Sequence, residues 1–157
     1  MKHRLAIAAI AFLALFVADL SSAQRVEGRA WGDIHVRTID GATYEFQRSG
    51  EFIASRSTAG DLEVQLRLES SGFSPHVSVA TAAAVQVDST RVSVALKRKP
   101  ALHVDGHPED LAEGFLDLPD GGRIERSKKG YEIYWADGSV LSLNVRKRHI
   151  NAFLRPA

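Results

Sequence analysis

The chain contains no cysteine among its 157 residues. Disulfide cross-links, iron–sulfur clusters, thiolate zinc sites and cysteine nucleophiles are therefore excluded. A disulfide-linked oligomer is excluded for the same reason. Stability must come from a buried apolar core, and a chain of this length buries about two-thirds of its unfolded surface.

The sequence also lacks an excess of charge of either sign. It has 20 Lys and Arg residues against 19 Asp and Glu residues, which gives a formal net charge of +1. Nucleic acid is not an expected partner, because no basic field would attract its phosphates. A composition of 45% hydrophobic and 25% charged residues is typical of one globular domain.

The longest hydrophobic run lies near the N-terminus, from Leu5 to Ala18, behind the basic residues 2–4 and ahead of Ser21-Ser22-Ala23. This order is typical of an export signal, and it predicts a signal peptide over residues 1–23 with cleavage after Ala23. The run is shorter than the ~20 apolar residues that a stable membrane span needs. The expected location is secreted, periplasmic or on the cell surface.

Helical periodicity is lacking after residue 30, where the hydrophobic period is two. Apolar residues alternate with polar ones from Leu62 to Leu68, and shorter alternations occur at Val77 and Val79, at Val85 and Val87, and over 92–96. Turn signals containing Gly separate these segments. The pattern predicts an all-β fold, an antiparallel β-sandwich of about ten short strands with tight Asp-Gly turns, and allows one short helical turn within 108–114.

Two hairpins have a predicted register, since apolar faces and turn chemistry must agree. A three-residue loop at Ala136-Asp137-Gly138 would pair Ile133 with Leu141 and Tyr131 with Leu143, with Gly138 left-handed. The same reasoning at Asp120-Gly121-Gly122 pairs Leu118 with Ile124 and makes Gly122 left-handed.

The segment Trp31-Gly32-Asp33-Ile34-His35 is followed by Thr38-Ile39-Asp40-Gly41, Tyr44-Glu45-Phe46 and Gly50-Glu51-Phe52. This order resembles the opening of the von Willebrand factor type D domain, which typically has W-G-D-P-H, T-F-D-G, Y-x-F and G-x-[CE]-[YF]. The bacterial, cysteine-free members are the more similar ones. The resemblance places a short lead at 24–29, the sandwich at 30–146 and a C-terminal tail at 147–157.

The resemblance implies an extracellular, non-enzymatic β-sandwich module for adhesion, assembly or protein binding, whose partner is an extracellular or envelope protein or polymer. Ile34 stands where the family often has Pro, so the Asp-Pro bond that some members cleave in themselves is missing. The motif residues carried over are Trp31, Gly32, Asp33, His35, Asp40 and Gly41.

The resemblance raises calcium as a candidate cofactor. Family members bind it with the Asp of T-F-D-G, here Asp40, and with a later loop of Asn and Asp residues, where this chain has Asn151 to Ala157. Calcium needs six to eight oxygen ligands, and Asp40 supplies one or two. The expectation is that Asp40 forms an Asx-turn beside Gly41 and that no cofactor is required.

An alternative function is a metal-dependent hydrolase that uses Asp33, His35 and the segment His103 to His107. Asp33 and His35 share a strand face, where the histidine could instead orient a buried carboxylate. His103, Asp105 and His107 alternate in the same way, but Asp105-Gly106 indicates a turn, which would break the alternation. No nucleophile motif accompanies these residues, so the binding module is the favoured hypothesis.

Two further groups have ordinary structural interpretations. The basic runs 97–99 and 146–148 are expected at solvated strand ends, although they could dock an acidic polymer or a membrane surface. Four aromatic residues are expected to pack at one end of the core: Trp31, Tyr44, Phe46 and Phe52.

Overall fold

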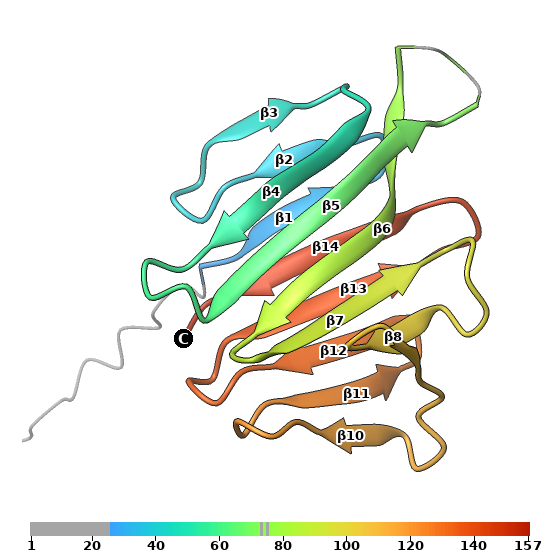
Figure 1. Ribbon diagram of the computed structural model, residues 1–157. Helices are drawn as coiled ribbons and strands as arrows, with labels where there is room; N and C mark the ends of the chain where they lie inside the picture. Colours follow the sequence, from blue (N-terminus) through green and yellow to red (C-terminus); the bar gives the residue numbers. More distant parts are fainter. Residues whose placement is uncertain (1–25, 73, 75) are drawn as a thin grey trace, which may run out of the picture.

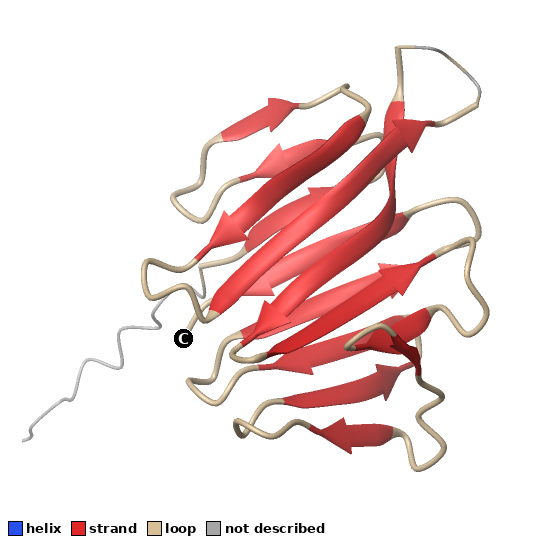
Figure 2. Cartoon of the chain, in the orientation of Figure 1, coloured by secondary structure: helices blue, strands red, loops and turns tan. Residues whose placement is uncertain are grey.

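A computed structural model describes residues 26–72, 74 and 76–157, and in this part of the chain it contains strands and no helix (Figure 2). The predicted signal peptide at 1–23 lies outside the described residues. Within the described ranges, no helix is long and apolar enough to span a membrane.

The described chain forms fourteen strands, more than the ten that alternation predicts, because strands of two or three residues are too short to show a period. They are β1 (Gly28–Trp31), β2 (His35–Arg37), β3 (Thr43–Glu45), β4 (Gly50–Arg56), β5 (Leu62–Ser70), β6 (Ser78–Val87), β7 (Thr90–Ala95), β8 (Leu102–Val104), β9 (His107–Pro108), β10 (Phe115–Asp117), β11 (Arg123–Ser127), β12 (Gly130–Tyr134), β13 (Val140–Val145) and β14 (Ile150–Arg155).

The strands build two antiparallel sheets that pack face to face (Figure 1). Sheet A has the order β10-β11-β12-β13-β14-β1-β2-β3, and sheet B has the order β4-β5-β6-β7-β8-β9. The predicted all-β sandwich is therefore confirmed. The chain crosses between the sheets twice, from edge strand β3 to edge strand β4 and from edge strand β9 to edge strand β10.

The C-terminal boundary inferred from the sequence is wrong. Residues 147–157, interpreted as a tail, include β14, which pairs with β13 on one side and with β1 on the other. Ile150, Ala152 and Leu154 are buried on its inner face. The lead at 24–29 is also too long, since β1 begins at Gly28. The sequence did not reveal β14, because its inner face has only three alternating apolar residues and it follows closely on the basic run 146–148.

The core of sheet B follows the predicted alternation in β5, where Leu62, Val64, Leu66 and Leu68 are all buried. At the start of β6 the prediction fails, because Ser78 and Ala80 are buried there instead of Val79 and of Val77, which precedes the strand. The register between β5 and β6 shifts at Arg67 and Leu68. This β-bulge reverses the phase of the strand, so one apolar pattern cannot describe both of its halves.

The last hairpin has the predicted register. Ile133 pairs with Leu141 and Tyr131 with Leu143, and Gly138 has a φ of +96°. The hairpin of β10 and β11 does not, since Leu116 rather than Leu118 lies opposite Ile124. Its three-residue loop is 119–121, and the left-handed residue is Gly121 at φ +84°.

The reason for the shift lies in tertiary packing around Gly122. A Cβ built there would lie 2.8 Å from Cγ1 of Val87 and 2.9 Å from the carbonyl oxygen of Tyr134. Gly122 is therefore needed for a close approach inside the core rather than for a left-handed backbone.

The crossing from β9 to β10 contains no helix, contrary to the helical turn allowed within 108–114. It makes a turn in which the amide of Gly114 donates to the carbonyl of Leu111 over 3.0 Å, and Leu111 is buried. Arg126 of β11 binds the carboxylate of Asp110 across this crossing. The segment therefore covers the core between the edge strands β9 and β10.

Candidate functional site

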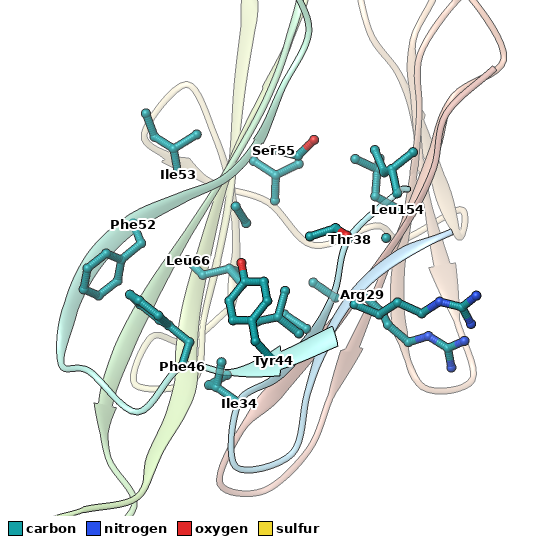
Figure 3. Close-up of a pocket in the computed structure, with 18 of the residues that line it drawn as sticks. Arg29, Ile34, Thr38, Tyr44, Phe46, Phe52, Ile53, Ser55, Leu66 and Leu154 are labelled. Carbon is teal, nitrogen blue, oxygen red and sulfur yellow. The ribbon is translucent and has the colours of Figure 1, made fainter. Parts of the chain in front are cut away.

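The most prominent feature for function is an apolar cavity of about 610 Å³ between the two sheets, at the side where β3 and β4 form their edges. Figure 3 shows the residues that line it, with Leu66 reaching in from sheet B and the ring of Tyr44 lying in the gap between the sheets. The size falls in the ~300–1,000 Å³ range typical of small-molecule sites, which are also mainly apolar.

Small residues leave this space open. Ala30 and Ala152 face inward as a cross-strand pair in sheet A. Ala54 and Ser55 line the cavity from β4 in sheet B. Elsewhere in the sandwich, inward positions hold fully buried branched side chains such as Ile124 and Leu102, which fill the space between the sheets.

The mouth of the cavity is rimmed by apolar side chains that water reaches. Ile39 is 41% exposed, Tyr44 is 51% exposed and Ile53 is 51% exposed, and all three line the cavity. Only two other large hydrophobic residues of the described chain are comparably exposed, Val26 and Phe115. A cluster of exposed apolar side chains is typical of a binding surface rather than of ordinary surface.

The energetics of an apolar space this large favour an occupant. An enclosed empty cavity costs about 24 cal/mol per Å³, so an enclosed space of this volume would cost about as much as the ~5–15 kcal/mol that stabilises a domain. The open mouth admits water, but water against aliphatic walls is also unfavourable. Apolar material that displaces this water would therefore bind favourably.

Asp40 lies at the cavity in the turn between β2 and β3, where its carboxylate accepts a hydrogen bond from the hydroxyl of Thr38. This bond, helped by the backbone amides of Asp40 and Ala42, lowers the pKa of Asp40 below its ordinary value. The amide contacts fit the Asx-turn predicted beside Gly41, which has a φ of +94°. Asp40 is therefore an ionised, exposed carboxylate at one end of the cavity.

The W-G-D-I-H segment forms the connection between β1 and β2. Ile34 is buried against the cavity with a φ of +21°, which is unusual for a β-branched residue. Trp31 lies on the opposite, outer face of sheet A, with the guanidinium of Arg29 5.4 Å and the ring of His35 5.7 Å from its ring centre. The expectation that Trp31 packs in the core is thus wrong, since Ala30 takes the inward position.

The other three aromatic residues do gather at the cavity. Phe46 and Phe52 pack edge to face with their ring centres 4.8 Å apart, and both are half-buried against the core. Tyr44 lies on the short edge strand β3, and its large exposed fraction shows that sheet B does not cover it. These residues therefore form an incomplete end of the core.

His35 sits between two carboxylates on the surface of sheet A. Its Nε2 lies 2.8 Å from Oδ1 of Asp33, and its Nδ1 lies 3.7 Å from Oε1 of Glu45. The Asp33 side chain is 54% exposed, so the buried carboxylate considered from the sequence is wrong. Sequence reasoning missed Glu45, although a hairpin centred on Asp40-Gly41 places it opposite His35.

The histidines considered for a hydrolase do not converge. His35 belongs to β2 in sheet A, whereas His103 belongs to β8 near the other side of sheet B. Asp105 and Gly106 form the predicted turn, with φ values of +47° and +83°, so the alternation is broken between His103 and His107. Across the described ranges, no group of three or more His, Asp or Glu side chains is placed to hold a metal ion.

Both basic runs lie in exposed connections. Residues 97–99 belong to the loop from β7 to β8, where Lys97 forms an ion pair of 3.0 Å with Glu69. Residues 146–148 form the tight turn from β13 to β14, closed by the amide of Arg146 on the carbonyl of His149. These positions are at strand ends, as expected.

The cavity itself could not be found in the sequence. Its walls come from β1 to β5 and from β13 and β14, two groups of strands that are distant from each other in the chain. The available signal was the set of small residues at inward positions, and that signal has meaning only when strands and faces are known. A comparison with the sequence profiles of known protein families gives no match for this chain.

Proposed function

We propose that this protein is a non-enzymatic binding module that works outside the cytoplasm, and that its binding region is the open side of the sandwich between β3 and β4. One observation carries the proposal: an apolar cavity opens there behind a rim of exposed Ile39, Tyr44 and Ile53. Adhesion or assembly with an extracellular or envelope protein or polymer is the role suggested by the resemblance to von Willebrand factor type D domains.

The geometry favours binding over catalysis. The cavity holds one carboxylate, Asp40, beside hydroxyl groups, with no histidine among its lining residues. General acid–base or nucleophilic catalysis needs paired groups within hydrogen-bond reach of the reacting atoms. The pair of Asp33 and His35 lies on a half-exposed outer surface and does not line the cavity.

The binding region can be tested by photo-crosslinking. A benzophenone amino acid would replace Ile53 at the rim, and in a second variant it would replace Phe115, which is 42% exposed on β10 far from the cavity. With an envelope extract of the source organism, we expect adducts from position 53 and none from position 115. Equal labelling at both positions, or none at either, would contradict the proposed region.

Export can be tested separately. Cleavage after Ala23 would leave Gln24 as the first residue of the exported protein, which mass spectrometry would detect as the free or pyroglutamate form. Recovery of intact Met1 from the membrane fraction would contradict it.

A further inference from the structure

The two ends of the cavity differ in chemistry. At one end lie Ile34 and the edge-to-face pair of Phe46 and Phe52, which offer hydrocarbon surface (Figure 3). At the other end lie Thr38 and Asp40, in the turn that follows β2. Thr38 lies four residue steps beyond Ile34 along nearly extended chain, so the ends are about 13 Å apart.

Cationic groups face away from this space. Arg29 is among the residues that line the cavity, but its guanidinium points away from it to the outer face of sheet A, as Figure 3 shows. Arg37 is the cross-strand partner of Arg29 and therefore shares that outer face. Among the described lining residues, the charge left at the cavity is the carboxylate of Asp40, accompanied by the hydroxyls of Thr38, Tyr44 and Ser55.

The open edge is poorly suited to an added peptide strand. β4 carries a β-bulge between Ile53 and Ser55. A bulge interrupts the regular spacing of backbone donors and acceptors and is a common way to protect an edge strand from further pairing. An occupant that needs no backbone ladder fits this edge better than a strand does.

We propose that the cavity binds the hydrocarbon chain of a single-chain amphiphile whose head group carries no negative charge and donates hydrogen bonds, as a sugar hydroxyl does. The chain would lie toward Phe46 and Phe52 and displace water from the aliphatic walls. The head group would stay at the mouth and donate hydrogen bonds to Asp40, whose negative charge disfavours an anionic head group. This inference rests on the proposed function, because it names the ligand class for the same open side.

The test is calorimetric titration with alkyl glucosides from hexyl to decyl, each below its critical micelle concentration. Every added methylene buried in the cavity should tighten binding about fourfold. The gain should stop once the chain is longer than the cavity. Decyl sulfate should bind at least about tenfold more weakly than decyl glucoside, and Asp40→Asn should narrow that difference.

A matched pair of variants separates the cavity from general surface adsorption. Ser55→Phe places a ring in the cavity from edge strand β4 and should weaken decyl glucoside binding more than tenfold. Ser142→Phe makes the same change on the outer face of β13, next to the buried Leu141 and Leu143, and should leave binding unchanged. Thermal melts establish that each variant is folded, and Ala54→Phe replaces Ser55→Phe if that variant is not.

Three results would overturn the inference. One is an affinity that does not depend on chain length, and a second is equal weakening by Ser55→Phe and Ser142→Phe. The third is capture of a polypeptide by the crosslinker at position 53, together with no binding of any alkyl glucoside to the same protein. In the third case the proposed binding region stands and only the ligand class fails.

Discussion

On both sides of the sandwich the chain crosses from an edge strand of one sheet to an edge strand of the other, but the interiors behind the two crossings differ. On one side the chain crosses from edge strand β9 to β10 and buries Leu111, with Leu102, Ile124 and Ile133 fully buried behind it. On the other side it crosses from β3 to β4, and Ala30 and Ala152 face a cavity. We call these the closed side and the open side.

Topology therefore does not decide whether this sandwich closes. A crossing between edge strands covers a core only when the inward side chains are large enough to fill the space behind it. Large branched residues do so on the closed side, whereas Ala and Ser leave a gap on the open side. The following predictions test this difference, from the largest expected effect to the smallest.

Gly130→Ala should have the largest effect. A Cβ there would lie 2.1 Å from the carbonyl oxygen of Leu143 and 2.9 Å from the amide of Val145, so β12 and β13 would have to separate. We expect a loss of at least about 4 kcal/mol in the free energy of unfolding, measured by urea denaturation. Gly60→Ala is the control, because nothing lies within 4 Å of its Cβ; an equal loss there would contradict the packing argument.

Leu143→Ala and Tyr44→Ala compare the two sides directly. Leu143 is fully buried outside the cavity, and its truncation should cost about 3 kcal/mol. Tyr44 is 51% exposed on the open side, so its loss should cost less than about 1 kcal/mol. Denaturant midpoints measure both. Similar losses would mean that the open side carries as much of the core as the closed side.

Gly138→Val should cost about 1–2 kcal/mol, since its φ of +96° strains a β-branched residue although no atom lies within 4 Å of its Cβ. Gly138→Asn tolerates the left-handed region and should lose much less. Thermal melts compare the two variants. Equal melting temperatures would show that the loop on this hairpin carries no backbone strain.

Ala152→Leu should stabilise the protein by about 1 kcal/mol, because the larger side chain fills part of the open side. Ala83→Leu makes the same change at a buried position of β6 that does not line the cavity, and it should destabilise the protein. Chemical denaturation should give changes of opposite sign in the free energy of unfolding for the two variants, which would sharpen the comparison. The same sign for both would show that the two interiors are equally packed.

Asp88→Asn should have the smallest effect, and it should depend on pH. Asp88 lies in the turn from β6 to β7, where burial and the nearby carboxylates of Asp120, Asp61 and Asp137 raise its pKa above the ordinary value of 3.8. Its Oδ2 is buried and accepts no hydrogen bond from the described residues.

A raised pKa in the folded state means that ionisation of Asp88 destabilises the fold as the pH rises through that pKa. Asn should therefore raise the melting temperature at pH 7, and the gain should vanish below about pH 3. Asn also tolerates the φ of +50° at this position. A gain of equal size at both pH values would show that charge is not the cause.

Much of the fold could be predicted from the sequence, because alternation and turn chemistry act over a few residues. The period of two over 62–68 gave β5 and its buried face. The loop 136–138 fixed the register of β12 and β13, since Ile133 and Leu141 both require the inner face. The composition determined that a buried core, without cysteine, must stabilise the protein.

Tertiary contacts decided the rest. The bulge that reverses the faces of β6, the shift that leaves Gly122 against Val87, and the central place of β14 all arise between segments far apart in the chain. The cavity arises in the same way, because an alanine in one sheet leaves a gap only if the facing residue is also small. Local sequence determines which side chains share one face of a regular strand, and only the packing of the two sheets determines which face turns inward and whether the inward side chains meet.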